Sequence, residues 1–254
     1  EYVQQAISKL SLLLEQPSED CIPIRADKID IPDKKDFISS GVQWLDQALG
    51  GGFRKEELFI VGGSPHAGKS TLLTYISGQY VKQGKIVLHF NLEDILQDVD
   101  ERYGKMLEEK HKEQIYFVDS PNKIGLSTID SVISKMPINP DIVVVDYLDC
   151  LKYDGSGQDW IESGNISSGL RSIAKKHNCV LLTGSQLLFP GTSQGMERFY
   201  KSKVGKTAPA DLIFIIDEQL DGEFFMTVGK AKGRSVKEKK FKFTLNFDTM
   251  ETWQ

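Results

Sequence analysis

The sequence has few cysteines, no long apolar run and no excess of basic charge. Its three cysteines, Cys21, Cys150 and Cys179, stand at spacings that fit neither a zinc site nor a disulfide framework, so we read them as reduced thiols. The longest apolar runs, such as Ile142–Val145, are far shorter than the roughly eighteen residues of a membrane helix. These absences exclude a disulfide-stabilised secreted domain and predict a soluble protein that does not enter a membrane.

The chain is long enough for one large domain, and its basic charge is concentrated in one segment. It has 254 residues, of which 40% are hydrophobic, and a net charge of −5. This balance argues against a protein that coats nucleic acid through its whole surface. Between Lys230 and Lys242, however, Glu238 is the lone acidic residue among several lysines and Arg234. Any polyanionic partner is therefore expected to bind locally.

The first 36 residues differ in character from the rest. The apolar spacing over residues 3–14 predicts an amphipathic helix, which Pro17 ends, and residues 16–36 are polar and interrupted by prolines. The first residue is Glu1 rather than Met, which indicates a piece of a longer protein. We expect a linker helix and tether over residues 1–36 and one folded domain over residues 37–254.

Beyond Phe37, short β-rich runs alternate with helical stretches. This alternation predicts an α/β fold with a mostly parallel sheet, helices on both faces and an antiparallel hairpin at one edge. The expected strands are Leu58–Gly62, Ile86–Asn91, Ile115–Asp119, Ile142–Asp146, Val180–Ser185, Leu212–Asp217, Phe224–Lys230 and Lys239–Asn246. The expected helices are Thr71–Gln83, Ile95–Glu109, Ser127–Met136 and Asn165–Lys176.

A phosphate-binding loop follows the first predicted strand. Its fixed spacing is a glycine, four residues and then Gly-Lys-Ser, here read as Gly63, Ser64, Pro65, His66, Ala67, Gly68, Lys69 and Ser70, with Thr71 opening a helix. Backbone N–H groups and the helix N-terminus would hold the phosphates. Lys69 would bridge the β- and γ-phosphates, Ser70 would hold Mg²⁺, and Thr71 would lie near the α-phosphate. The alternative is an ordinary glycine-rich turn.

Two further strands end in carboxylates. Asp146 ends a buried β-branched strand, where a carboxylate can bind the water shell of magnesium, although many parallel strands end in Asp. Glu93 follows another strand, and a carboxylate at that edge can deprotonate a water for attack on the γ-phosphate. Asp94 is its rival for this role, and Glu93 could also simply cap the following helix.

A third strand ends in Gln186, which could bind the γ-phosphate and transmit its loss into residues 187–204. That segment contains Arg198, Lys201 and Lys203 and has no apolar periodicity. It is either a mobile element that touches nucleic-acid phosphates or a solvated loop with ordinary basic residues.

Taken in order along the chain, these motifs resemble the RecA-fold hexameric replicative helicases, the DnaB-like family with its bacteriophage relatives. The resemblance runs from about Ser39 to Trp253. It rests on the entry segment Gly41–Asp46 with Gly50–Gly52, the phosphate loop, Asn91-Leu92-Glu93, Val144-Val145-Asp146-Tyr147-Leu148, Ser185-Gln186 and Ala231-Lys232-Gly233-Arg234. The last two are the most specific, since a generic phosphate-loop kinase or GTPase would not have them there.

The resemblance implies a RecA-like P-loop NTPase that forms a homo-hexamer, with ATP or another NTP and Mg²⁺ bound between subunits. Lys232 and Arg234 would reach the neighbouring subunit's nucleotide, with a solvated basic turn as the alternative for Arg234. Single-stranded DNA would thread the ring along two loops, Asp154–Asn165 and Leu187–Val204, although the first has no Lys or Arg. The helix over residues 3–14 would dock on the adjacent subunit.

A primase or helicase loader is the further partner that the resemblance implies, in the cytoplasm of a bacterium or a bacteriophage-infected cell. The family's usual upstream primase-interacting domain has no counterpart in this sequence. Two other interpretations stay open: a RecA- or KaiC-like ATPase acting in recombination or signalling, and a non-catalytic module that binds nucleotide only to assemble. Glu93 argues against the non-catalytic module, because it would supply a catalytic base.

Overall fold

The structure is a computed structural model that describes residues 25–26, 37–152, 159–187, 209–218, 223–234, 236, 240–246 and 250–253. The chain divides into two compact units, Glu1–Asp36 and Phe37–Gln254. The helix predicted over residues 3–14 lies outside the described residues, as do Arg198, Lys201 and Lys203 of the predicted DNA loop. In the part of the chain that is described, no helix is long and apolar enough to cross a membrane.

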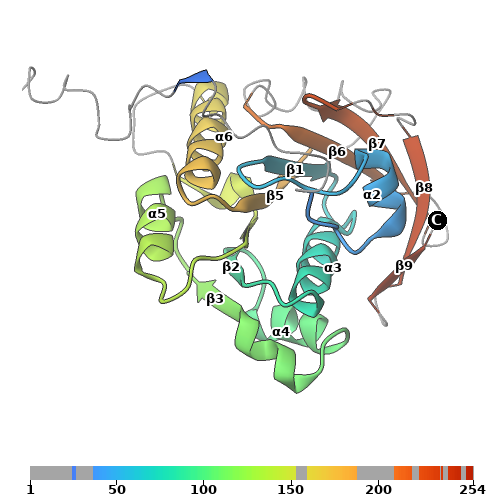
Figure 1. The fold of residues 1–254 in the computed structure, drawn as a ribbon, viewed down its shortest axis with the longest axis horizontal. Helices are drawn as coiled ribbons and strands as arrows, with labels where there is room; N and C mark the ends of the chain where they lie inside the picture. Colours follow the sequence, from blue (N-terminus) through green and yellow to red (C-terminus); the bar gives the residue numbers. More distant parts are fainter. Residues whose placement is uncertain are drawn as a thin grey trace, which may run out of the picture. The chain divides into compact units, whose positions relative to one another are not determined.

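The centre of the fold is a nine-stranded sheet with the order β3-β2-β4-β5-β1-β6-β7-β8-β9 (Figure 1). Strands from β3 to β6 in this order pair in parallel, and β7, β8 and β9 are added antiparallel at one edge. The predicted sheet, mostly parallel with an antiparallel edge, is confirmed. The strands are β1 Leu58–Gly63, β2 Val87–Asn91, β3 Ile115–Asp119, β4 Ile142–Asp146, β5 Val180–Gln186, β6 Leu212–Glu218, β7 Glu223–Ala231, β8 Lys240–Asn246 and β9 Glu251–Trp253.

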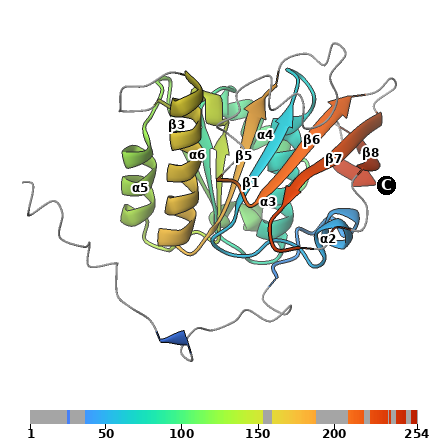
Figure 2. The ribbon, with the colours of Figure 1, turned by 90° about the horizontal axis from the view of Figure 1, so that it is seen from above.

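Helices cover both faces of the sheet, with α5 and α6 on one face and α2, α3 and α4 on the other (Figure 2). The described helices are α2 Gln43–Leu49, α3 Lys69–Lys82, α4 Leu96–Gly104, α5 Leu126–Lys135 and α6 Asp159–Lys176, with 3₁₀ turns η3 Glu109–Gln114 and η4 Leu148–Cys150. The prediction of helices on both faces is confirmed.

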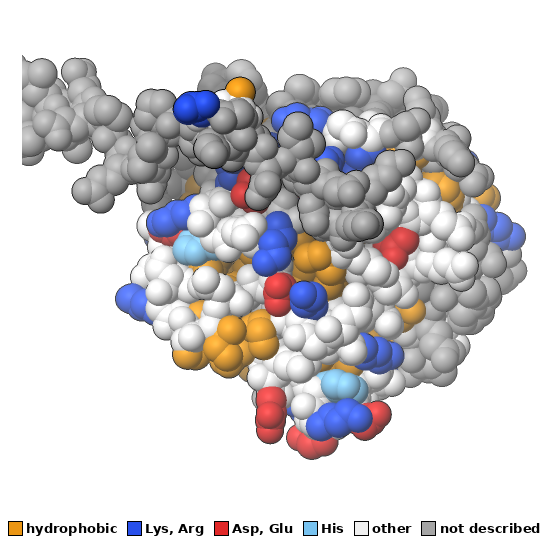
Figure 3. Space-filling model, in the orientation of Figure 1, with side chains coloured by type: hydrophobic (Ala, Val, Ile, Leu, Met, Phe, Trp, Pro, Cys, Tyr) orange, Lys and Arg blue, Asp and Glu red, His pale blue; other side chains and the backbone are white. Residues whose placement is uncertain are grey.

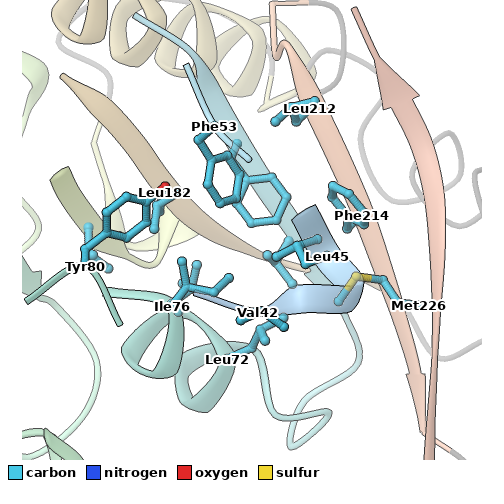
Figure 4. Close-up of a cluster of buried hydrophobic side chains, with 14 of the residues drawn as sticks. Val42, Leu45, Phe53, Leu72, Ile76, Tyr80, Leu182, Leu212, Phe214 and Met226 are labelled. Carbon is cyan, nitrogen blue, oxygen red and sulfur yellow. The ribbon is translucent and has the colours of Figure 1, made fainter. Parts of the chain in front are cut away.

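Alternate residues of the central strands supply the two cores, because successive side chains of a strand point to opposite faces. In β1, Phe59 and Val61 pack with α2 and α3, whereas Leu58 and Ile60 pack with α6. Figure 4 shows the first of these clusters, in which Phe53, Phe214 and Leu45 lie around β1. A strand buried on both faces reads as a continuous apolar run, which is why β1 and β4 were visible in the sequence.

Three elements differ from the sequence prediction. Helix α4 ends at Gly104, a residue of low helix propensity, and a 3₁₀ turn follows where a longer helix was expected. Helix α2 ends at Gly50, which adopts the left-handed conformation that favours glycine. Helix α6 begins at Asp159, so the second half of the predicted DNA loop Asp154–Asn165 is helix instead.

On the face shown in Figure 3, acidic and basic side chains of the described residues lie interspersed. This mixture agrees with the nearly balanced composition of Lys+Arg 31 against Asp+Glu 36.

Candidate active site

Four neighbouring parallel strands, β2, β4, β5 and β1, bring their carboxyl ends to one edge of the sheet. In an open α/β sheet, ligands bind at this edge. Here it opens into a cavity of about 360 Å³. The cavity is lined by Pro65, His66, Gly68, Lys69, Ser70, Thr71, Glu93, Asp94, Arg102, Tyr147 and Gln186. The structure therefore brings together the phosphate loop, the candidate base and the candidate sensor, which the sequence places far apart.

The loop between β1 and α3 has the geometry of an anion cradle. His66 and Gly68 both have positive φ, 62° and 79°, and α3 begins directly at Lys69. The first N–H groups of a helix have no partner within the helix, so they can donate to an anion. A Cβ at Gly63 would lie 3.2 Å from both the Ala67 Cβ and the Ile216 carbonyl oxygen, so the loop packs tightly only with glycine there. These features favour the phosphate-loop interpretation over an ordinary turn.

The Lys69 ammonium lies over the loop. Its Nζ donates to the Ser64 carbonyl at 2.8 Å and to the Gly63 carbonyl at 3.3 Å. Both contacts hold the positive charge at the mouth of the cradle, where phosphate oxygens would be bound.

Ser70 and Asp146 form the pair of oxygen ligands that magnesium needs. The Ser70 hydroxyl donates to the Asp146 carboxylate, and Asp146 is 3% exposed. Asp146 Oδ1 is buried and has no hydrogen-bond partner within the described residues. Burial is the largest cause that raises the pKa of Asp146, to about 6. A buried carboxylate with an unused oxygen beside a hydroxyl fits Mg²⁺, which takes few protein ligands and completes its shell with water and phosphate.

That small ligand set is consistent with a second observation. Among the described residues, no group of three or more His, Cys, Asp or Glu side chains could hold a metal by itself. A metal at Ser70 and Asp146 would therefore depend on the phosphates of a nucleotide for further ligands.

Glu93 lies two residues beyond β2, at the same edge as Lys69. The pKa of Glu93 is raised, first by partial burial and then by the Asp94 carboxylate, while Lys69 and His66 act in the opposite direction. A raised pKa makes a carboxylate a stronger base. Asp94, its rival in the sequence, is instead bound to Arg102, with Oδ2 2.6 Å from Nη1. The arrangement favours Glu93 as the base.

Sequence reasoning missed Arg102, whose guanidinium side chain lines the cavity from α4. A signal was present, because Val99 and Tyr103 of the same helix are buried and Arg102 lies between them on that stripe. An arginine on an apolar stripe indicates a charge kept for a purpose, but its direction into the cavity depends on how α4 packs.

Gln186 ends β5 at the cavity and is held by its neighbours. The Tyr147 hydroxyl donates to Gln186 Oε1 at 3.2 Å, and burial is the largest cause that raises the pKa of this tyrosine. The sequence marks Tyr147 as the aromatic residue after Asp146 and assigns it no role. The contact places a phenol beside the candidate sensor.

Lys232 and Arg234 lie at the other end of the sheet. Arg234 contacts Glu57, which precedes β1, and the carbonyl oxygens of Leu49 and Gly52. The length of β1, about 20 Å at 3.3 Å per residue, separates this end from the phosphate loop. Neither cation can therefore reach the cavity of its own chain.

The two cations differ in exposure. The Arg234 side chain is 3% exposed and lies over the Phe37 ring, 4.8 Å from its centroid. The Lys232 side chain is 63% exposed. Arg234 is thus not part of a solvated basic turn, and its action on a neighbouring subunit stays a prediction.

The strand order and the site at its carboxyl edge define a RecA-like P-loop ATPase domain. Its fold is that of a solved helicase ATPase domain, with a TM-score of 0.70, 14% identity and coverage of 98% of this chain and 97% of that one. It is also that of a DnaB-like replicative helicase, described with its interactions with primase, with a TM-score of 0.68, 15% identity and coverage of 97% and 69%. The predicted resemblance to replicative helicases is confirmed for the fold.

Sequence comparison gives shorter matches. The DNA repair protein RadA of Campylobacter jejuni is 50% identical over 50 residues, which is 20% of this chain and 11% of that protein. RadA of Mycolicibacterium smegmatis is 31% identical over 134 residues, 51% of this chain and 26% of that protein. The chain thus spans about a quarter or less of these two relatives. No family profile matches it.

Proposed function

We propose that this chain is the motor domain of an ATP-dependent DNA helicase, which hydrolyses nucleotide to move along single-stranded DNA and separate a duplex. The proposal rests on one observation. A phosphate loop, a buried carboxylate with an unused oxygen, a carboxylate with a raised pKa and a glutamine line or adjoin a single cavity on a helicase-type fold.

Each residue at the cavity has a distinct part in this proposal. Lys69 and the loop N–H groups bind and neutralise the phosphates. Glu93 accepts the proton of the attacking water, and Gln186 contacts the γ-phosphate. Arg102 adds a second positive charge at the cavity, and Asp94 holds it in place. Such a site acts by positioning and electrostatic stabilisation, which phosphoryl transfer requires.

Ser70 and Asp146 would hold Mg²⁺. When bound, the ion would neutralise the charge that develops on the β- and γ-phosphate oxygens.

The assembly is part of the proposal. Lys232 and Arg234 cannot serve their own cavity, so a use in nucleotide chemistry requires a second copy, and we propose the ring of six that the helicase resemblance implies. Single-stranded DNA would be bound by the segment with Arg198, Lys201 and Lys203. The DnaB-like neighbour is described with primase, and we propose a primase or a loader as the further partner here, in the cytoplasm of a bacterium or a bacteriophage-infected cell.

The test is hydrolysis and unwinding by the purified protein and by Lys69→Ala, with Lys82→Ala, at the far end of the same helix, as the matched control. We expect Lys69→Ala to abolish both activities with an unchanged unfolding temperature, because this lysine neutralises phosphate and does not pack the core. Wild-type hydrolysis by Lys69→Ala would refute the site. Hydrolysis without any unwinding by the wild-type protein would refute the helicase assignment while keeping the hydrolase.

The matches to DNA repair protein RadA favour a second candidate, a RecA- or KaiC-like ATPase that acts in recombination or signalling without unwinding. The nucleotide chemistry would be the same and the assembly would differ. Electron micrographs with an ATP analogue and single-stranded DNA discriminate between them, because closed six-membered rings support the helicase and extended filaments support the recombinase.

A further inference from the structure

The strand that carries the candidate sensor loses one of its neighbours just before the cavity. The pairing of β5 with β4 runs from Val180 to Thr183 and goes no further in the described structure. On the other side, the pairing of β5 with β1 continues to Gln186, which lies opposite Gly63 of the phosphate loop. The end of β5 is therefore anchored to the phosphate loop on one side only, as far as the sheet is concerned (Figure 2).

A carboxylate replaces the missing strand contact. Asp149 lies in the 3₁₀ turn η4, three residues after Asp146, and its Oδ2 accepts the Gln186 backbone N–H at 3.0 Å. The same oxygen accepts the Ser185 hydroxyl at 3.4 Å. A hydrogen bond to an ionised acceptor is about twice as strong as a neutral one. Asp149 thus holds the end of β5 where the β4 ladder no longer does.

The side chain of Gln186 is held from the same segment, because the Tyr147 hydroxyl donates to its Oε1 at 3.2 Å. The next N–H, that of Leu187, donates to the Gly63 carbonyl at 2.9 Å. Gln186 is thereby fixed through its main chain by Asp149 on one side and through Leu187 by the phosphate loop on the other. The residues after Asp146 and the phosphate loop together determine where the glutamine lies.

The position of this carboxylate has an electrostatic cost. Asp149 is among the charges that raise the pKa of Glu93, so its negative charge reaches the cavity that would receive phosphate. A like charge beside an anion site disfavours anion binding. A carboxylate at this position is therefore expected to provide something that outweighs the repulsion, and the anchoring of Gln186 is what its contacts provide.

We propose that Asp149 is a positioning residue for nucleotide hydrolysis, which acts by holding Gln186 in reach of the γ-phosphate. This inference rests on the proposed function, since it assigns a supporting residue to that same site. Asp149 itself contacts neither substrate nor metal. Its effect on turnover passes through Gln186.

The test is a double-mutant cycle on the full chain, with single-turnover ATP hydrolysis as the readout. Asp149→Leu removes the acceptor at nearly constant volume and is expected to lower kcat about 10- to 100-fold, the usual effect of a small misplacement, with little change in KM. Asp149→Asn is the matched control and is expected to stay within a few-fold of wild type, because its amide oxygen can accept the same N–H. In a Gln186→Ala background, Asp149→Leu is expected to cause no further loss.

Two results would overturn the inference. One is wild-type turnover by Asp149→Leu, and the other is an equal fractional loss from Asp149→Leu with and without Gln186, which a general structural role would produce. If Asp149→Leu does not fold, as judged by its thermal unfolding, Asp149→Ala completes the same cycle. Lys69→Ala and Glu93→Gln, measured in parallel, report on the proposed function itself. If both retain turnover, that function fails and the inference fails with it; if both lose turnover and Asp149→Leu does not, the inference fails alone.

Discussion

Glu57 and Arg234 form a buried ion pair at the amino-terminal end of β1, although 177 residues separate them in the sequence. The guanidinium also donates to the Leu49 carbonyl at 3.2 Å and lies over the Phe37 ring. The pair therefore joins the turn after β7 to the segment that leads into β1. Arg234 has a structural role in its own chain, whatever it does toward a second one.

We expect Arg234→Ala to lower the free energy of unfolding by about 3–5 kcal/mol, because it leaves the Glu57 carboxylate buried without its partner. Urea denaturation followed by circular dichroism measures this change. Lys232→Ala is the matched control, since Lys232 is exposed, and it is expected to change stability by no more than about 0.5 kcal/mol. Equal midpoints for the two variants would contradict the structural role of Arg234.

Glu93→Gln is expected to bind ATP with nearly wild-type affinity and to hydrolyse it about 100- to 10,000-fold more slowly, because the amide keeps the shape and removes the base. Binding titration and single-turnover hydrolysis separate the two effects. Asp94→Asn is not a neutral control, because Asp94 holds Arg102. Asp98→Asn, on the exposed first turn of α4, is the better control and should behave as wild type. Parallel losses of binding and turnover in Glu93→Gln would instead indicate a structural role.

The pH dependence of hydrolysis follows from the raised pKa of Glu93. A general base must be deprotonated, so activity is lost as the pH falls through its pKa. We expect the acidic limb of the kcat/KM profile to lie above the ordinary glutamate value of about 4.3. Asp94→Asn removes a charge that raises this pKa and should move the limb to lower pH. A limb that does not move in this variant would argue against Glu93 as the titrating group.

The sequence predicted the sheet and the phosphate site well, for a physical reason. Strands such as β4 are apolar on both faces, and the phosphate loop is one continuous segment whose geometry is local. The same reasoning placed Glu93, Asp146 and Gln186 at strand ends, because parallel strands end at one edge of the sheet.

What the sequence could not give are contacts between distant segments. Arg102 reaches the cavity because of the way α4 packs, and Arg234 is buried because Glu57 happens to lie beside it. The short strand β9 was missed, since three residues carry too little periodicity to be recognised. These features depend on tertiary packing, which a local pattern does not encode.

Neutralising Arg198, Lys201 and Lys203 together is expected to weaken binding of single-stranded DNA and to flatten its salt dependence. Each lost phosphate contact releases fewer counterions and lowers the slope of log affinity against log salt by about 0.7. A binding titration at several salt concentrations measures this slope, and basal hydrolysis should largely survive. Neutralising Lys105, Lys110 and Lys112, around α4 and η3, is the matched control of equal charge change. An unchanged slope would place the DNA contacts elsewhere.

Lys232 is expected to act on the nucleotide of a neighbouring subunit. It lies at the opposite end of β1 from Lys69, about 20 Å away, and its side chain is exposed. A cation supplied across an interface can contribute about three to five powers of ten in rate, because it stabilises charge on the transferred phosphoryl group. Arg234, the other member of the predicted pair, would have to leave Glu57 to do the same.

A mixing experiment tests this action between subunits. Lys69→Ala and Lys232→Ala subunits are each expected to be inactive alone. Mixed, they can form interfaces that pair an intact phosphate loop with an intact Lys232, and we expect hydrolysis to reappear. Lys232→Ala suits this better than Arg234→Ala, because losing Arg234 also breaks the buried pair with Glu57 and lowers activity through folding. If Lys232→Ala is fully active alone, or if the mixture remains inactive, the cation does not act across the interface; repeating the mixture with Arg234→Lys, which keeps a positive charge, then asks the same question of its partner.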